Sequence, residues 1–361
     1  MYLSHMLLVF VISIVENFAA SCEIFNNVTM KVKIKSSSGL SNSYDISSFH
    51  GCIESSVFQE DVVEVTLIDQ SVKSIGYESV RNMPDLEKLS FISCEVEKIS
   101  RMAFKNLPQF RILKVDNSNL REIPAGIFSN TSKLKSMSFR ENDILSIEPH
   151  AFSDLKSLKQ IIVSKNDLKT WNALWFTGSP NIEKLDFSFN QLEILPASAF
   201  QEIPKLKELE LSFNELESIE PGSFTNLNML TYLGLNHNRL TKIDANVFPD
   251  QFNVDILTIN ANFLNYLSKD VRDKLYVKEI TLEGNPWECR CFDDIRNWLL
   301  NSKSTLKTEY CNDDNVPQCS FSSIAFQNCS EETNENLIET YIESIKVLDP
   351  PTHELCARLD Y

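Results

Sequence analysis

The hydrophobic positions of this chain recur in an eleven-residue pattern that returns every 24 residues. Each copy places apolar side chains at its first, fourth and sixth positions, as in LEKLSFISCEV from Leu86 and LKELELSFNEL from Leu206. Alternation with a period of two predicts a short β-strand with one buried face. The copies begin at Val62, Leu86, Phe110, Leu134, Leu158, Ile182, Leu206, Leu230 and Val254, and a tenth begins at Val277, one residue early. One repeat cannot bury this face alone, so the pattern predicts a stack of ten strands.

Two further columns of residues share this period. A polar residue occupies the ninth position of each repeat, where its side chain can pair with backbone groups as the chain turns inside the core. These residues are Gln70, Cys94, Ser118, Asn142, Asn166, Asn190, Asn214, Asn238, Asn262 and Asn285. An aromatic column follows later in each repeat, with Val80 in the first: Phe104, Phe128, Phe152, Phe176, Phe200, Phe224 and Phe248. Rings at this spacing predict a spine that widens the outer side, so the stack curves with its sheet on the concave surface.

The pattern L-x-x-L-x-L-x-x-N-x-L resembles the leucine-rich repeat family over about residues 62 to 329. The segment NPWECRCFDDIRNWLL and the cysteines after it are similar to the cysteine-rich C-terminal flank of extracellular members. The resemblance implies an α/β solenoid: a curved horseshoe with a parallel concave sheet, a short or irregular convex side and disulfide-bonded caps. The overall layout is also similar to insect extracellular leucine-rich proteins, including the leucine-rich immune proteins of mosquitoes.

The chain divides into five segments. The apolar run from Leu7 to Val15, with small residues at Ala19 to Ser21, predicts a signal peptide over residues 1–21. An N-terminal cap over 22–61, repeats over 62–285, a cysteine-rich cap over 286–330 and an acidic helical tail over 331–361 follow. No later stretch approaches the roughly 20 apolar residues of a membrane span, so we expect a secreted, extracellular protein without a span.

Nine cysteines behind an export signal indicate an oxidising compartment. Cys94 lies in the ninth-position column and is expected to be buried and free. Cys22 and Cys52 bracket the segment before the first repeat, which favours a bond between them. The family resemblance implies Cys289–Cys311 and Cys291–Cys329. Two alternatives remain for Cys319 and Cys356: they pair within the chain, or one of them links two chains into a dimer.

The tail and three sequons add surface features. Apolar residues recur at helical spacing from Leu337 to Leu348, and two prolines follow at Pro350 and Pro351. This pattern predicts a helix, either docked on the C-terminal cap or used for dimerisation. N-glycosylation is expected at Asn-x-Ser/Thr sites, which are Asn27, Asn130 and Asn328.

Function is expected on the concave surface. There the second, third, fifth, seventh and eighth positions of each repeat are not required by the core. Basic residues gather in repeats three to five and acidic residues in repeats six and seven, which suits a protein partner of mixed charge. The candidate partner-binding residues combine cations with aromatic and aliphatic side chains: Arg140, Ile162, Lys165, Phe189, Phe213, Tyr232, His237 and Ile256.

Charge and motifs exclude other classes. Fifty Asp and Glu against 34 Lys and Arg leave a net charge of −16, which argues against nucleic acid as a partner. No nucleophile elbow, phosphate loop or metal-protease helix occurs, so we expect no enzyme, no cofactor and no metal. The predicted function is binding of another extracellular protein, with innate immunity as its setting. Direct recognition of a microbial glycan or lipid, and a matrix or adhesion role, are the alternatives.

Overall fold

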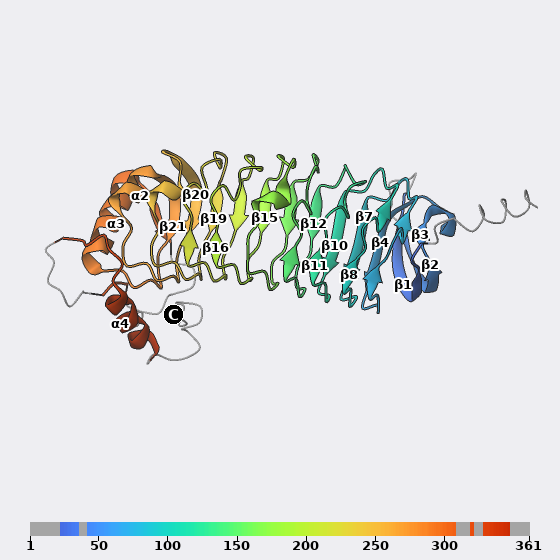
Figure 1. Cartoon of the computed structure of the whole chain (residues 1–361), viewed down its shortest axis with the longest axis horizontal. Coiled ribbons are helices and arrows are strands. Elements are labelled where there is room, and N and C mark those ends of the chain that lie inside the picture. Colours follow the sequence, from blue (N-terminus) through green and yellow to red (C-terminus); the bar gives the residue numbers. More distant parts are fainter. Residues whose placement is uncertain (1–21, 36–41, 308–317, 321–327, 347–361) are drawn as a thin grey trace, which may run out of the picture.

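A computed structural model of the chain describes residues 22–35, 42–307, 318–320 and 328–346. The predicted signal peptide, Cys311 and Cys356 lie outside these residues. The described chain forms an elongated, curved solenoid of stacked turns, with an antiparallel hairpin at its start and three helices near its end (Figure 1).

The predicted parallel sheet is present and runs the length of the array. Within the described residues it has 13 strands, ordered β2-β1-β4-β7-β10-β12-β14-β15-β17-β19-β20-β21-β22. The ten repeat strands are β4 (Val62–Ile68), β7 (Lys88–Ile92), β10 (Ile112–Asp116), β12 (Ser136–Ser138), β14 (Gln160–Ile162), β15 (Lys184–Asp186), β17 (Glu208–Glu210), β19 (Tyr232–Gly234), β20 (Phe252–Thr258) and β21 (Leu275–Thr281).

The register of this sheet follows the sequence period. The first three residues of β10 each pair with the residue 24 positions later in β12, as Ile112 does with Ser136, and the same offset continues to β20. Equivalent positions of successive repeats therefore stand side by side. A side chain at a given position has its nearest neighbours at the same position of the adjacent repeats.

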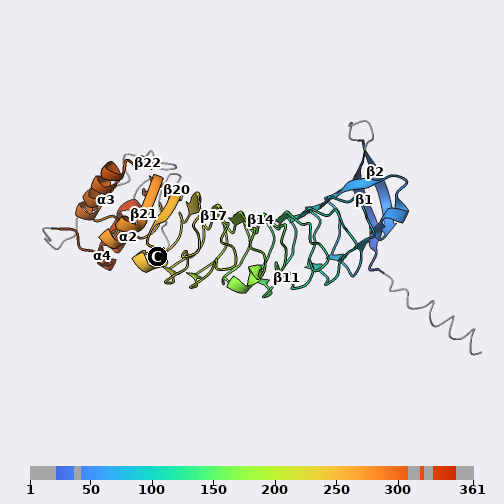
Figure 2. The ribbon, with the colours of Figure 1, turned by 90° about the horizontal axis from the view of Figure 1, so that it is seen from above.

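The opposite side of the solenoid has little regular structure, as the predicted fold class requires. Figure 2 shows the sheet on the hollowed side and β11 on the other side. The short elements here are β3 (Ile53–Glu54), η1 (Ser55–Val57), β5 (Ser74–Ile75), β6 (Val80–Arg81), β8 (Lys98–Ile99), β9 (Phe104–Lys105), β11 (Glu122–Ile123), β13 (Ser146–Ile147), η2 (Ala173–Phe176), β16 (Ile194–Leu195), β18 (Ser218–Ile219) and η3 (Ala245–Val247).

The ninth-position asparagines form a continuous hydrogen-bonded ladder inside the core. Asn190 is typical: its Oδ1 accepts from the backbone N–H of Leu168 at 3.1 Å, and its Nδ2 donates to the carbonyl of Val163 at 2.9 Å. All seven asparagines of the column are buried. The first three repeats are less regular, since Cys94 and Ser118 make fewer such bonds. Cys94 is buried and free, as expected.

The predicted phenylalanine spine is present, but it is interrupted once. Rings stack at centroid distances of 6.5 Å for Phe104 and Phe128 and 6.1 Å for Phe152 and Phe176. Between Phe176 and Phe200 lies Trp171, with ring centroids 5.9 and 5.1 Å away. Its indole N–H donates to the carbonyl of Ala199 at 3.2 Å, so the inserted ring is both packed and hydrogen-bonded. The 24-residue pattern does not predict this ring, because Trp171 lies outside the phenylalanine column.

An antiparallel hairpin covers the first repeat. Strands β1 (Phe25–Ile34) and β2 (Ser43–Gly51) pair with each other, and β1 also pairs antiparallel with β4. The alternate residues Met30 and Val32 are fully buried against the core. The Cys22–Cys52 disulfide holds this cap. Sequence reasoning expected the disulfide but not the hairpin, because this segment does not share the repeat pattern.

The C-terminal cap contains helix α3 (Cys289–Ser302), strand β22 (Thr305–Lys307) and two disulfides. On this helix, Ile295 and Leu299 are buried in the core of the repeat array, and Trp298 packs against the same core while partly buried. Glu288 caps the helix by accepting from the backbone N–H groups of Arg290 and Cys291.

One predicted disulfide is wrong. Cys291 bonds Cys329 as expected, but Cys289 bonds Cys319 and not Cys311. The physical reason is local pairing of backbone: Cys289 N–H donates to the carbonyl of Ser320, and Ser320 N–H donates to that of Trp287. This bridge brings Cys319 to a Cα–Cα distance of 4.9 Å from Cys289. Cys319 is therefore used within the chain, which excludes it as the link of a covalent dimer.

The corrected pairing is directly testable. We expect non-reducing proteolysis and mass spectrometry to recover a linked peptide pair that contains Cys289 and Cys319. Reduction before digestion should abolish this species while leaving the separate peptides. Recovery of Cys289 linked to Cys311 would contradict the structure.

The predicted tail helix is present as α4 (Glu335–Lys346), but it docks on the repeats. Ile338 and Ile342 are buried and cluster with Phe263, in the ninth repeat just before the short helix α2 (Lys269–Lys274). The Asn265 amide donates to the carbonyl of Glu332 at 2.9 Å and accepts from the N–H of Asn334. The apolar face of the helix, one predicted use of which was dimerisation, thus packs against the repeats of the same chain as far as Ile342. Leu348 lies outside the described residues.

Candidate functional site

The chain turns sharply at the eighth position of every repeat. All ten residues there adopt the left-handed backbone conformation, with φ between 50° and 69°. They are Asp69, Ser93, Asn117, Glu141, Lys165, Phe189, Phe213, His237, Ala261 and Gly284. For a residue with a Cβ this conformation is unfavourable by roughly 1–2 kcal/mol, and for a bulky side chain it is a true outlier. Small residues such as Ser93 and Ala261 adopt the same turn. The turn therefore does not require the aromatic rings found in repeats six to eight.

These eighth-position residues form a ladder along the carboxyl ends of the strands. The Lys165 ammonium bonds Glu141 at 2.7 Å and lies 6.0 Å from the ring centroid of Phe189. The rings of Phe189 and Phe213 stack at 4.2 Å, and those of Phe213 and His237 at 4.1 Å. Stacking compensates part of the backbone strain. We call residues 141, 165, 189, 213 and 237 the eighth-position ladder.

Exposure divides this ladder into two parts. Lys165 is exposed and Phe189 is 44% exposed, whereas Glu141 and Phe213 are half-buried. His237 was expected in the exposed cluster, but it is only 5% exposed. The stack on Phe213 and the contact of its Nδ1 with the Asn236 amide at 3.1 Å account for part of this burial. The expectation of an exposed His237 is therefore wrong.

The seventh position also differs from expectation. Arg140 is exposed there, but the equivalent side chains of repeats five to nine are buried: Ser164, Ser188, Ser212, Asn236 and Asn260. They sit just before the turn, where hydrogen bonds draw them inward, as when Thr258 Oγ1 donates to Asn236 Oδ1 at 2.9 Å. The surface available to a partner thus consists mainly of the second, third, fifth and eighth positions.

Several charges on the concave surface form ion pairs between adjacent repeats, and the basic and acidic patches that the sequence suggested are therefore partly neutralised. Lys159 and Lys207 both bond Glu183, and Lys184 bonds Glu208. The hydrogen bond from Lys159, and then that from Lys207, lowers the pKa of the Glu183 carboxyl to about 2. Similarly, the Lys165 hydrogen bond lowers the pKa of Glu141.

The pKa of Glu183 provides a test of this pairing. Because its pKa is depressed, the carboxylate and its two ion pairs persist as pH falls and are lost only near pH 2. Replacing Lys159 or Lys207 by Ala should raise the pKa toward 4.5, as followed by carboxyl NMR against pH. Lys184→Ala is the matched control, since Lys184 pairs with Glu208. Equal pKa values in all three variants would contradict the ion-pair assignment.

The remaining candidates lie on the strands themselves. Ile162, Tyr232 and Ile256 are partly exposed, and the last two line a hollow of about 540 Å³ over β15 to β20. Ile162 lies on β14, the strand that pairs with β15 on its N-terminal side. The structure thus brings Phe189, Phe213, Tyr232 and Ile256 to one region and leaves Arg140 and Ile162 to the N-terminal side of it.

The sequons lie away from this surface. Asn27 is exposed in the hairpin, Asn130 follows the phenylalanine column on the convex side and Asn328 is exposed beside the cap. Glycosylation at these positions stays a prediction. In the part of the chain that the structure describes, no helix combines the length and apolar character needed to cross a membrane.

Comparison with known proteins agrees with this architecture. The chain matches the family described as BspA type leucine rich repeat region, in six copies, over residues 11–111, 51–183, 121–255 and 169–293. No curated protein matches it. Solved structures with a similar fold include the following two. A chain of the mouse RP105/MD-1 complex has 20% identity and a TM-score of 0.55, and one of the Drosophila Toll–Spatzle complex has 18% identity and a TM-score of 0.55.

These similarities concern the fold. The first covers 67% of this chain and 42% of the mouse chain, and the second covers 64% of this chain and 31% of the Drosophila chain. This chain therefore spans less than half the length of either. At such identities the shared feature is the curved repeat array, and the side chains of the concave surface have to be interpreted from this chain alone.

Proposed function

The chain belongs to the family of BspA-type leucine-rich repeat regions, and from this premise we propose that it is a secreted binding protein and not an enzyme. Its proposed ligand is another extracellular protein, held by the concave sheet together with the eighth-position ladder. Three disulfides among the described residues support an oxidising, extracellular setting.

One observation carries this proposal: the stacked pair Phe189 and Phe213. Phe189 keeps 44% of its surface exposed while its backbone is held at φ 53°. Neither ring belongs to the hydrophobic core. The other repeats serve as an internal comparison, because eight of the ten build the same turn without Phe. Exposed rigid rings beside cations are the side chains that anchor protein interfaces.

Innate immunity is the proposed setting. Both similar chains come from complexes with protein partners, and the Toll–Spatzle complex is described as a hub in Drosophila development and innate immunity. The resemblance of the sequence layout to insect extracellular leucine-rich proteins is the reason for proposing this setting. A microbial glycan or lipid ligand and a matrix partner are the alternatives, and the capture experiment described next distinguishes them from an immune protein partner.

The test is capture of partners from the source's extracellular fluid by the purified chain, with identification by mass spectrometry. A captured protein is then titrated against Phe189→Ala/Phe213→Ala and Arg140→Glu/Lys165→Glu. We expect each double variant to bind at least tenfold more weakly, because central aromatic anchors contribute about 2 kcal/mol or more and tenfold is about 1.4 kcal/mol.

Matched controls change exposed residues outside the concave surface. Leu145→Ala removes a 60% exposed apolar side chain, and Lys169→Glu reverses a charge in the next repeat. Both should bind like the unaltered chain. Equal affinity of the ring variants and these controls would reject the concave site. Binding to washed microbes with no captured protein would favour direct microbial recognition.

A further inference from the structure

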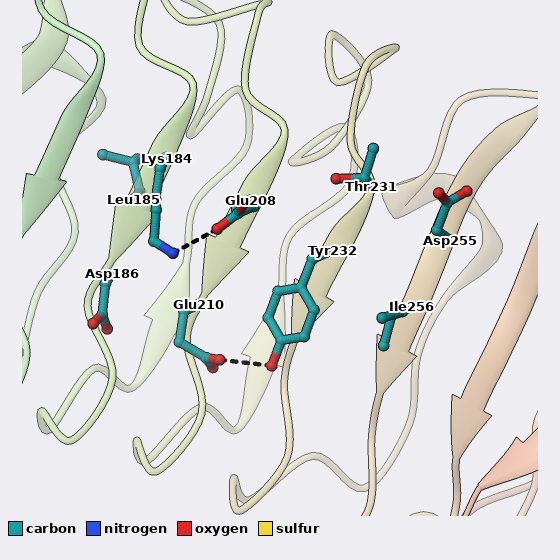
Figure 3. Close-up of a pocket in the computed structure, with 9 residues that line it drawn as sticks. All are labelled: Lys184, Leu185, Asp186, Glu208, Glu210, Thr231, Tyr232, Asp255 and Ile256. Atoms are coloured by element: carbon teal, nitrogen blue, oxygen red, sulfur yellow. Dashed lines mark hydrogen bonds and ion pairs between the residues drawn. The ribbon is translucent and has the colours of Figure 1, made fainter.

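A hollow opens in the concave sheet where four successive repeats meet (Figure 3). It has a volume of about 540 Å³ and lies over β15, β17, β19 and β20. Its lining consists of Lys184, Leu185, Asp186, Glu208, Glu210, Thr231, Tyr232, Asp255 and Ile256. Gly234 leaves space here, since a Cβ at that position would lie 2.2 Å from Oε1 of Glu210.

Most charges of the hollow are paired within the sheet. Lys184 bonds Glu208 at 2.5 Å, and Lys278 bonds Asp255 at 2.8 Å. Asp186 and Glu210 are different, because among the described residues neither has a cation within ion-pair distance. Asp186 accepts from the N–H and hydroxyl of Ser188 through Oδ1, and Glu210 accepts from neutral donors only.

The side chains of these two residues project from the same face of adjacent strands, and Figure 3 shows the Glu210 carboxylate turned toward Tyr232. Asp186 pairs with Glu210 in the register of β15 and β17, and adjacent strands lie about 4.8 Å apart. Like charges on adjacent strands repel each other. A cation that bonds both carboxylates would remove this repulsion, so the sheet favours a positively charged group at this point.

The walls of the hollow restrict which cation fits. The Tyr232 hydroxyl donates to Oε2 of Glu210 at 2.7 Å, which places the phenol ring directly beside the carboxylate (Figure 3). Ile256 supplies an apolar wall on the next strand. A guanidinium bonds carboxylates through a planar fork and lies flat on aromatic faces, whereas an ammonium is a compact point charge that has no such fork. Phe189 follows Asp186 by three residues and Phe213 follows Glu210 by three residues, so the stacked ring pair lies at the ends of the same two strands.

We propose that this hollow binds an arginine side chain of the protein partner, with Asp186 and Glu210 bonding the guanidinium and Tyr232 contacting its face. The stacked rings of Phe189 and Phe213 then contact an apolar residue of the same partner segment. This inference rests on the proposed function and specifies the partner's chemistry: an exposed segment that carries arginine next to an apolar side chain.

The test uses a random dodecapeptide display library, panned in parallel on the full chain and on Asp186→Asn/Glu210→Gln. We expect arginine-containing peptides to be enriched on the unaltered chain. A fluorescein-labelled synthetic peptide of the most enriched sequence, measured by fluorescence polarisation, should bind the double variant at least tenfold more weakly. Replacing its arginine by citrulline, which keeps the shape but removes the charge, should weaken binding to the unaltered chain equally and to the double variant little.

A matched control separates the hollow from the general acidity of the chain. Glu193→Gln/Glu217→Gln removes two charges from the same two repeats, at exposed positions outside the concave strands, and should bind the peptide like the unaltered chain. Gly234→Ala retains both carboxylates but displaces that of Glu210, which can move because it ends a flexible side chain; we expect weaker peptide binding with an unchanged circular dichroism spectrum.

Three outcomes would overturn the inference: no enrichment of cationic peptides, equal enrichment on the double variant, or equal loss in the control pair. Lysine replacing arginine without loss of affinity would exclude the guanidinium contact. If the ring variants lose the captured partner but Asp186→Asn/Glu210→Gln does not, the arginine site fails while concave binding stands. If no concave variant affects capture, the proposed function fails as well.

Discussion

Asn190→Leu should lower the free energy of unfolding by roughly 3–5 kcal/mol. Asn190 is 6% exposed, and its side chain accepts from Leu168 N–H and donates to the carbonyls of Val163, Phe187 and Ser188. Leucine has a similar shape but leaves the Leu168 N–H buried without this partner, at about 1–3 kcal/mol. The Nδ2 group has two hydrogens to share among these carbonyls, so the loss of its hydrogen bonds adds about 1–3 kcal/mol in total.

Urea denaturation followed by circular dichroism and by tryptophan fluorescence measures this change. Coincident transitions are required, because repeat arrays can lose cooperativity when one interface is weakened. Asn253→Leu is the control, an exposed asparagine on β20. If both variants were equally stable, the internal asparagine ladder would have no special role in stability.

Phe152→Ala should destabilise the fold by about 3–5 kcal/mol. Phe152 has no exposed surface, and its ring centroid lies 6.2 Å from that of Phe128 and 6.1 Å from that of Phe176. Truncation leaves a cavity that the rigid neighbouring repeats cannot close. Because the spine keeps the convex side wide, the defect also loosens two interfaces between repeats.

Phe189→Ala is the comparison for this variant, measured by the same denaturation. It removes a ring that is 44% exposed and loses one stacking contact, so its effect on stability should stay near or below about 1.5 kcal/mol. Partner binding should show the reverse order, with Phe152→Ala close to normal in folded material and Phe189→Ala impaired. Equal destabilisation by the two substitutions would show that Phe189 is structural.

Much of the fold could be predicted because the repeats constrain each other. The 24-residue period determines that Ile112 pairs with Ser136 and Lys184 with Glu208. The Trp171 insertion, the β1–β2 hairpin and the Cys289–Cys319 disulfide could not be predicted in this way. Each depends on a segment that occurs once, so no second copy indicates where its partners lie.

The candidate surface was predicted in part for the same reason. Position in the repeat identified Phe189, Phe213, Tyr232 and Ile256 as side chains that the core does not require. It did not predict the burial of His237, nor that Asp186 and Glu210, which the 24-residue offset places side by side, have no cation within ion-pair distance among the described residues. Both depend on neighbours in adjacent repeats and on which side chains already hold a partner.

The sequence by itself therefore determined the solenoid, its curvature and the column to which each residue belongs, because burial of a repeated apolar face permits only stacking. Only the tertiary structure decided the left-handed turn of the eighth position, the pairing of charges between strands and the hollow beside Gly234. These features arise from contacts across repeats, where the side chain of one turn occupies or leaves open the space next to another.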